Sequence, residues 1–459
     1  MKFLKALFPA LFICSSLFAQ NPDSIIIRKI YDEALENGHA YKNLEFLCKQ
    51  IGPRLSGSAN AQKSVDWTKK LMEDYGFDRV YLQELMVPVW ERGAKEEAYI
   101  LDGKIKIPVP IAALGGSIAT SAKGITAPIL EVQNFEELKA LGADIVKGKI
   151  IFFNRPFDPK LFNTFSAYSG AVNQRSQGAI EAAKLGAVAV IVRSMSSVID
   201  DFPHTGGMVY QDGVNKIPGA AISTKAADLL SQKLMQKKYP SAQFYFKQNC
   251  RTLPDAVSYN VIGEIKGTVD PEGIISVGGH LDSWDLAEGA HDDGTGVMQS
   301  VEVLRIFKQL NLKPRHTIRA VMFMNEENGL RGGLKYAEIA KQNKEKHIAA
   351  LESDAGGYTP RGFNVENAPK SLAHFSKWKP LFAPYLVDAI IPGGGGADIG
   401  PLRIMPDVVL IGFRPDSQRY FDIHHSSNDV FENVNRRELE LGAAAMTSLI
   451  YLIDQYGTK

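Results

Sequence analysis

The sequence contains few cysteines and has almost no net charge, and each of these features excludes some classes of protein. Three cysteines occur in 459 residues, too few to frame a small disulfide-rich domain. The 52 Lys and Arg residues balance 51 Asp and Glu residues, which gives a formal net charge of +1. Neither a nucleic acid nor an anionic membrane surface is therefore expected as a partner. At this length we expect two or three domains with a large core.

Several signature motifs are also missing. No H-E-x-x-H occurs, which excludes a single-zinc site of the thermolysin type, and no G-x-S-x-G occurs to support a serine-hydrolase elbow. The nearest approach to a phosphate-binding loop, at residues 148–150, lacks the Ser or Thr that would bind magnesium. The chemistry must therefore come from other residues.

The amino terminus has the pattern of a secretory signal. Two lysines precede an apolar stretch too short to span a bilayer, and small residues follow. We expect cleavage near Ala19 or Gln20, delivery to the periplasm or the medium, and no membrane span. Lipidation at Cys14 is the less favoured alternative. Cys48 and Cys250 would then remain, and their spacing leaves open whether they form a disulfide or stay as buried thiols.

Clusters of acidic residues and histidines follow apolar runs of strand length. Glu326 and Glu327 close the run at 321–324, which has the pattern of a buried strand rather than a helix. The other clusters contribute His280, Asp282, Asp292, Asp293, Asp354, His424, His425 and Asp429. Because open α/β sheets bind ligands at the carboxyl ends of their strands, we expect these clusters to meet there. Such a meeting of His, Asp and Glu predicts a two-metal hydrolase.

The charge of one ligand set suits two divalent cations. If Asp292 bridges the ions, His280 and Asp354 complete one site, and Glu327 and His425 complete the other. Three carboxylates then face four positive charges, and the surplus would lower the pKa of a bridging water so that it attacks as hydroxide. Ligation by nitrogen and oxygen without thiolate suits zinc best, although cobalt or manganese fits the same set.

Each element also has an ordinary structural explanation when it is taken alone. His280 could be a hydrogen-bonded core residue, and residues 292–294 could be a turn before a helix N-cap. A Glu–Glu pair is usually a solvated helix surface, but the apolar run before Glu326 argues against that. The occurrence of all the clusters together favours the metal site, and Glu326, where the chain turns, is free to act as general base.

The motifs together resemble the co-catalytic di-zinc exopeptidases, the family of aminopeptidase S and glutamate carboxypeptidase, and within it the carboxypeptidase Q branch. In chain order they are I-G-P-R-L-S-G-S, G-G-H-L-D-S-W-D, G-A-H-D-D-G-T-G, N-E-E-N-G-L-R-G, E-S-D-A-G-G, G-G-G-A-D-I-G-P and H-H-S-S-N-D. They span most of the chain. The resemblance implies the five ligands named above, Glu326 as the base, and Asp282 as a residue that orients His280 from outside the ligand set.

The resemblance implies further details. The family pattern places the ligand histidine four residues before an Asp, here Asp429, which selects His425 over His424. A cis peptide bond is expected between the bridging aspartate and the residue after it. A homodimer is expected on the same ground.

Two more residues are candidates for substrate binding. His291 stands where relatives carry Asn or Met, and the pattern assigns no role to its imidazole. Asp398, beside the glycine run at 393–396, is available to engage a charged substrate terminus.

The chain divides into four expected parts: a signal peptide at 1–20, a first catalytic part at 21–103, an insertion at 104–255 and a second catalytic part at 256–459. The insertion resembles a protease-associated domain, and we expect it to shape the substrate entrance. The catalytic parts read as an α/β fold with a mostly parallel, helix-sandwiched sheet. Helices are expected at 25–50, 61–75, after Asp292 and at 437–456, and strands at 79–87, 274–278, 318–324 and 408–413.

The leading functional hypothesis is a secreted di-zinc exopeptidase that hydrolyses dipeptides or short peptides with a free amino terminus. A broad aminopeptidase acting on longer peptides is the alternative within the same class. Two hypotheses from other classes are a non-catalytic binding protein on the same scaffold and an acyltransferase of the glutaminyl cyclase type.

Overall fold

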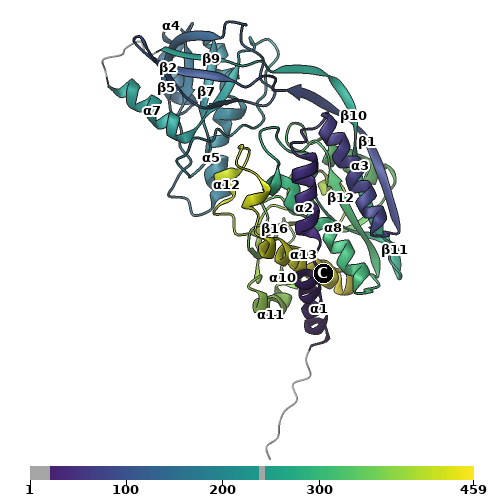
Figure 1. Ribbon diagram of the computed structural model, residues 1–459. Helices are drawn as coiled ribbons and strands as arrows, with labels where there is room; N and C mark the ends of the chain where they lie inside the picture. Colours follow the sequence, from purple (N-terminus) through teal and green to yellow (C-terminus); the bar gives the residue numbers. More distant parts are fainter. Residues whose placement is uncertain (1–20, 237–242) are drawn as a thin grey trace, which may run out of the picture.

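The computed structural model describes residues 21–236 and 243–459, so the expected signal peptide lies outside the described residues. Two eight-stranded sheets organise the chain and occupy separate lobes (Figure 1). No helix in the described ranges is long and apolar enough to cross a membrane. Cys48 and Cys250 are both buried and, among the residues described, neither forms a disulfide.

The first sheet carries the catalytic motifs. Its order is β1 (Arg79–Glu91), β10 (Arg251–Ile265), β12 (His316–Phe323), β11 (Asp270–His280), β13 (Lys346–Glu352), β16 (Val409–Pro415), β14 (Pro360–Val365) and β15 (Ala389–Pro392). The central strands β12, β11, β13 and β16 pair in parallel, whereas β1, β10 and β14 join by antiparallel pairing. Their central apolar runs are buried on both faces, as expected for parallel strands covered by helices.

Helices cover both faces of this sheet. One face carries α1 (Pro22–Asn37), α2 (Ala40–Phe46), α3 (Ala59–Asp74), α8 (Thr295–Gln309), α10 (Pro369–Phe375), α11 (Lys379–Phe382) and α13 (Arg436–Tyr456). The opposite face carries α9 (Arg331–Gln342) and the short 3₁₀ helix η5 (Gly400–Ile404). Helix α8 is buried on nearly every side because α13 packs over it. The predicted α/β class with a helix-sandwiched sheet is confirmed.

The helix predicted over residues 25–50 is interrupted. Helix α1 ends at Asn37, α2 starts at Ala40, and a π-helical turn (Leu47–Ile51) follows. Gly38 occupies the break in an extended conformation, and a side chain there would collide with the backbone of Ala34 and the carboxylate of Glu440. Tight packing against α13 therefore ends the first helix, which apolar spacing alone does not indicate.

The second sheet is formed by the insertion together with β2 (Glu97–Asp102), which lies just before residue 104. Its order is β3 (Ile105–Pro108), β2, β9 (Gln243–Lys247), β5 (Ile125–Val132), β6 (Ile150–Phe153), β7 (Ala189–Arg193), β8 (Gly219–Ile222) and β4 (Ile111–Ala113). It packs with α4 (Phe135–Val146), α5 (Thr164–Ser176), α6 (Gly178–Lys184) and α7 (Thr224–Met235). The long ribbon of β1 and β10 leads to this lobe (Figure 1).

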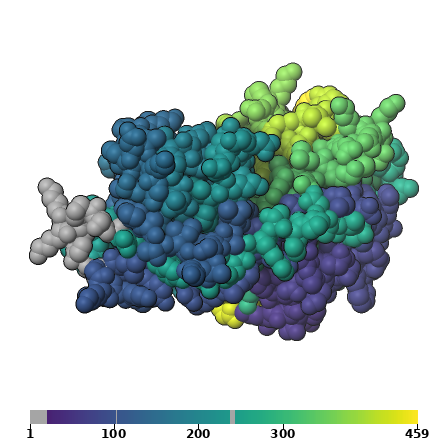
Figure 2. Space-filling view, turned by 90° about the horizontal axis from the view of Figure 1, so that it is seen from above, coloured from purple at the N-terminus to yellow at the C-terminus, as the bar shows by residue number. Residues whose placement is uncertain are grey.

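The two lobes contact each other directly. Gly115 of the insertion lies against the indole of Trp284, which follows β11 in the catalytic lobe. Arg92, just after β1, donates to the backbone carbonyl of Ala113 in the insertion at 2.6 Å and to both oxygens of Asp285 in the catalytic lobe at 2.6 and 2.9 Å. Figure 2 shows the insertion, in blue and teal, against the yellow and green segments that carry the later catalytic motifs.

We expect Gly115→Ala to weaken this contact, because the added methyl group would overlap the Trp284 ring. The free energy of unfolding should fall by about 1–3 kcal/mol, as for other overpacking substitutions. Urea denaturation followed by tryptophan fluorescence measures the change. Gly170→Ala is the control, because that glycine lies in α5 with open space around it. An unchanged stability for Gly115→Ala would show that the lobes are not tightly packed there.

Candidate metal centre

The predicted site residues follow the carboxyl ends of neighbouring strands. His280 is the last residue of β11, Glu326 and Glu327 follow β12, and Asp354 follows β13. Asp292 precedes α8, and His425 follows the short helix α12 (Tyr420–Ile423). Because β12, β11 and β13 are parallel neighbours, these loops meet at one edge of the sheet.

Asp292 lies between the two imidazoles. Its Oδ1 is 3.2 Å from Nε2 of His280, and its Oδ2 is 3.2 Å from Nε2 of His425. Nε2 of His280 also lies 3.7 Å from Oδ1 of Asp354, and Nε2 of His425 lies 3.0 Å from Oε2 of Glu327. Asp292 therefore has His280 and Asp354 on one side, and His425 and Glu327 on the other.

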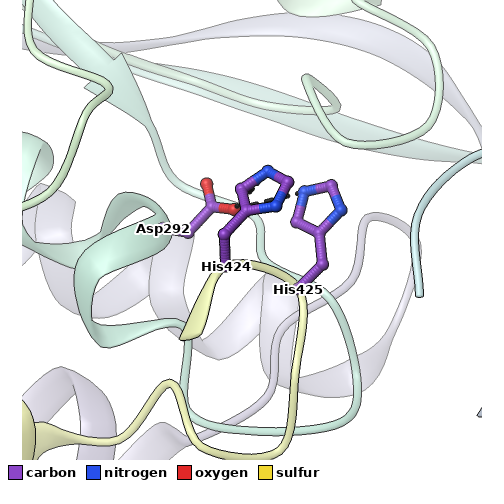
Figure 3. A group of neighbouring side chains, drawn as sticks. All are labelled: Asp292, His424 and His425. Carbon is purple, nitrogen blue, oxygen red and sulfur yellow. Dashed lines mark ion pairs between the residues drawn. The ribbon is translucent and has the colours of Figure 1, made fainter. Parts of the chain in front are cut away.

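The adjacent histidines differ in their contacts. Figure 3 shows His424 and His425 beside Asp292, with their rings stacked at a centroid distance of 3.5 Å. Both Nε2 atoms approach Oδ2 of Asp292, His425 at 3.2 Å and His424 at 3.6 Å. Among the contacts found, His425 alone also reaches Glu327. Asp292 can be grouped with His280 and Asp354, or with His424 and His425, as a possible metal site.

The hydrogen bonds of the two rings fit cations between these side chains. Nδ1 of His280 is 3.0 Å from the backbone carbonyl of Asp282, and Nδ1 of His425 is 3.4 Å from that of Thr205. A carbonyl only accepts, so Nδ1 of a neutral His280 ring carries the hydrogen and its Nε2 lone pair points at carboxylates. Nδ1 of His425 lies between the Thr205 carbonyl and Nη1 of Arg175, a donor that is also 3.4 Å away. Oδ2 of Asp292 is buried without a hydrogen-bond donor among the described residues. Lone pairs and carboxylates facing one another suit divalent cations.

Asp429 and Asp293 fix the backbone around these side chains. The Asp429 carboxylate accepts from the backbone N–H groups of His291 at 2.8 Å and Asp292 at 3.1 Å. Asp293 accepts from the N–H of His280 at 3.0 Å, and its other oxygen accepts from Gly296 at the start of α8. Burial raises the pKa of Asp429 to about 7. The predicted cis peptide bond between Asp292 and Asp293 is present.

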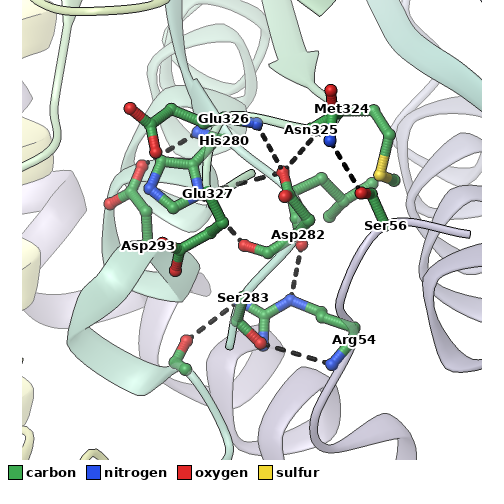
Figure 4. A network of polar contacts seen from close by, with 12 residues as sticks. Arg54, Ser56, His280, Asp282, Ser283, Asp293, Met324, Asn325, Glu326 and Glu327 are labelled. Carbon is green, nitrogen blue, oxygen red and sulfur yellow. Dashed lines mark hydrogen bonds and ion pairs between the residues drawn. The ribbon is translucent and has the colours of Figure 1, made fainter. Parts of the chain in front are cut away.

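Asp282 positions the glutamate pair. Its Oδ1 accepts from the backbone N–H groups of Asn325 at 2.7 Å and Glu326 at 3.1 Å (Figure 4). The same oxygen is 4.0 Å from Nδ1 of His280, so the carboxylate does not hold that ring directly. The Asp282 backbone carbonyl holds His280 instead. Orientation of His280 by this residue therefore runs through the main chain.

Arg54 supports the loop between His280 and Asp292. Its side chain is fully buried and donates to the backbone carbonyls of Leu281 at 2.6 Å, Glu288 at 2.5 Å and Gly289 at 2.9 Å (Figure 4 shows its surroundings). In the sequence, the motif I-G-P-R-L-S-G-S that contains Arg54 indicated only the family resemblance. The signal was present, because an arginine between apolar residues and a Gly–Pro turn needs buried acceptors.

His291 is engaged by the backbone. Its Nδ1 accepts from the N–H of Gly357 at 3.1 Å, and its Nε2 lies 3.2 Å from the carbonyl of Asn433. The ring stacks on Tyr358 at a centroid distance of 4.3 Å. Burial lowers the pKa of His291 to about 4, so the ring is neutral near pH 7. Both ring nitrogens therefore have hydrogen-bond partners in the backbone, and the imidazole has a structural role.

Asp398 is fully buried beside the glycine run. Neither of its carboxyl oxygens has a hydrogen-bond partner among the described residues, and burial together with nearby Glu352 raises its pKa. A cavity of 640 Å³ adjoins the metal-centre candidates at Asp354, and Asp398 is not among the residues that line it. Asp398 is therefore not part of the wall of this cavity.

The insertion forms part of the site. The backbone of Thr205 contacts His425 twice: its N–H donates to the His425 carbonyl at 2.9 Å, and its carbonyl lies 3.4 Å from Nδ1 of the ring. Phe162, Asn163 and Phe165 line the cavity together with the glycine run 393–396. Neither of these contributions is visible in the local sequence, because both depend on how the lobes meet.

The comparisons with known proteins agree with this geometry. A model of peptidase family M28 matches residues 260–449. Carboxypeptidase Q of Bos taurus is 35% identical over 430 residues, which cover 94% of this chain and 88% of that protein. The crystal structure of a peptidase M28 precursor from Shewanella amazonensis SB2B is 33% identical, with a TM-score of 0.88 over 94% of this chain and 96% of that chain. A zinc aminopeptidase from Bacillus subtilis, 22% identical, shares the fold with a TM-score of 0.65 over 91% of this chain and 95% of that chain.

The chain therefore belongs to peptidase family M28, as a metallo-exopeptidase similar to carboxypeptidase Q. The resemblance inferred from the motifs is confirmed. The likeness to carboxypeptidase Q over most of the chain favours a metallopeptidase over a non-catalytic binding protein or a glutaminyl cyclase.

We expect Asp429→Asn to weaken divalent-metal binding about 10- to 100-fold, as loss of an outer-shell partner typically does. An asparagine keeps one acceptor oxygen but points an NH₂ group at the second backbone N–H, so Asp292 loses its support. Competition with a chromophoric chelator measures the affinity. Asp416→Asn, which removes an exposed pair with Arg361, is the control. Equal affinities for the two variants would contradict this account of Asp429.

Proposed function

We propose that the protein is a di-zinc exopeptidase that hydrolyses dipeptides and short peptides with a free amino terminus. The observation that supports this most strongly is the position of Asp292, whose two carboxylate oxygens each face a different histidine and a different second carboxylate. Such a two-sided arrangement suits a pair of cations that share one bridging ligand.

The proposed ligands would form two metal sites that share Asp292. His280 and Asp354 would hold one zinc ion, Glu327 and His425 the other, and Asp292 both. When bound, the two ions would polarise the scissile carbonyl and lower the pKa of the attacking water. Zinc is favoured because the donors are nitrogen and oxygen without thiolate.

Glu326 is proposed as the general base. Its backbone is fixed by Asp282, while its carboxyl group makes no hydrogen bond within the described ranges. It would take a proton from the attacking water as the new C–O bond forms, and deliver that proton to the leaving amine as the C–N bond breaks. Glu327, the next residue, lies 3.0 Å from His425 and is assigned to the metal instead.

The walls of the cavity support a preference for short substrates. The glycine run and three residues of the insertion, Phe162, Asn163 and Phe165, line it together with Asp354. We expect walls contributed by both lobes to leave more room for a dipeptide than for an extended chain.

The proposed function predicts which substrates are hydrolysed and that the activity needs bound metal. Unblocked dipeptides should be hydrolysed rapidly, longer peptides more slowly, and amino-terminally acetylated peptides not at all. Chelation should abolish the activity and zinc should restore it. Amino-acid release measured by chromatography, with metal content determined in parallel, checks both points. Cleavage of an acetylated peptide, or activity without bound metal, would contradict the proposal.

The roles proposed for Glu326 and Glu327 predict different effects of substituting each residue. Glu326→Gln should keep bound metal while kcat falls roughly 10²- to 10⁴-fold, the usual contribution of a positioned general base. Glu327→Gln should instead lower the metal content, because an amide is a poorer ligand than a carboxylate. Steady-state kinetics and metal analysis of both variants provide the test. The reverse pattern would show that the two roles are exchanged.

A further inference from the structure

One cation that lines the 640 Å³ cavity beside Asp354 has no partner among the described residues. The charged residues that line it are Glu352, Asp354, Glu366, Arg403 and Arg414. Arg403 is paired with Glu366, whose Oε2 also accepts from the N–H of Gly395. The Arg414 side chain, by contrast, forms no ion pair or hydrogen bond with any described residue.

The charges of the other acidic groups are already engaged. Glu352 accepts from the N–H groups of Ala397 and Ile399, both at 2.8 Å, and so holds the end of the glycine run. Asp354 is assigned to a metal ion, and Glu366 is neutralised by Arg403. Arg414 is therefore the uncompensated charge on the cavity wall, and a guanidinium in that position suits a carboxylate.

The strand register places Arg414 level with Asp354. Strands β13 and β16 are parallel neighbours, and their last paired residues are Glu352 and Gly412. Asp354 and Arg414 each follow two residues later. A side chain at Gly412 would meet the carbonyls of residues 394 and 395, whereas Phe413 packs into the opposite core. Alternation along the strand thus puts Arg414 on the glycine-run side, where it lines the cavity.

We infer that Arg414 binds the α-carboxylate of the leaving residue and thereby makes the enzyme favour dipeptides; this rests on the proposed function. Neighbouring strands lie about 4.8 Å apart, and consecutive residues of a substrate lie about 3.8 Å apart. A scissile carbonyl held beside Asp354 would therefore place the next residue's carboxylate within reach of Arg414. In a longer peptide that position is an uncharged amide.

The test compares substrates that carry the carboxylate in different places. Ala-Ala has only the α-carboxylate, Ala-Glu-NH₂ only a side-chain carboxylate, and Ala-Ala-NH₂ neither. Arg414→Gln should raise KM for Ala-Ala about 10- to 100-fold with little change in kcat, which is the effect of losing charge-assisted hydrogen bonds to a ground state. Its effect on Ala-Ala-NH₂ should stay within about twofold.

Two further variants sharpen the comparison. Arg414→Lys should recover part of the loss, because it keeps the charge but not the planar fork. Arg361→Gln removes the same charge from neighbouring β14, where Arg361 is exposed and paired with Asp416 at 3.0 Å, and should behave like the native enzyme. Calorimetric titration of Ala-Ala into Glu326→Gln, with and without Arg414→Gln, should show the same weakening of affinity without turnover.

The results distinguish a failure of the proposed function from a failure of the role proposed for Arg414. If the native enzyme hydrolyses no dipeptide, the proposed function fails. If it does, but Arg414→Gln affects Ala-Ala and Ala-Ala-NH₂ equally, the role of Arg414 is overturned while the function stands. A loss confined to Ala-Glu-NH₂ would assign the bound carboxylate to the side chain and overturn the α-carboxylate assignment.

Discussion

The whole site depends on the buried carboxylate of Asp292, which has a histidine on each side. Asp292 meets His280 with one oxygen and His425 with the other, both at 3.2 Å. Asp429 accepts a buried hydrogen bond from the backbone N–H of Asp292 and so fixes the main chain from which the carboxylate projects. Three carboxylates and two imidazoles gathered so closely are electrostatically costly by themselves. The same arrangement becomes favourable when cations lie among them, and on this account metal binding stabilises the site that the chain assembles.

The site is shared between the two lobes. The catalytic sheet provides the strand ends, whereas the insertion provides the carbonyl of Thr205 beside His425. Arg92 and the contact between Gly115 and Trp284 fix how the lobes meet. The orientation of one candidate ligand therefore depends on packing far from it in sequence. The insertion is thus more than a cover over the entrance, because it also sets the direction of an imidazole.

The sequence predicted the fold class well because that signal is local. Apolar runs mark β11 and β12, and amphipathic spacing marks α8 and α13 with ends within a few residues. The candidate site residues could be predicted because motifs that follow parallel strands lie at the same edge of the sheet. Contacts made through backbone carbonyls were not readable: Arg54 binds three of them, and His280 is held by the carbonyl of Asp282 rather than by its carboxylate. The burial of Asp398 and the position of Arg414 also depend on tertiary neighbours, which local composition does not reveal.

The central claim is that Asp292 bridges two metal ions, and anomalous scattering from zinc-soaked crystals tests it most directly. The account predicts two zinc peaks about 3.5–4 Å apart, one beside His280 and Asp354 and the other beside Glu327 and His425, with Asp292 between them. A single peak, or two peaks of which only one contacts Asp292, would contradict it.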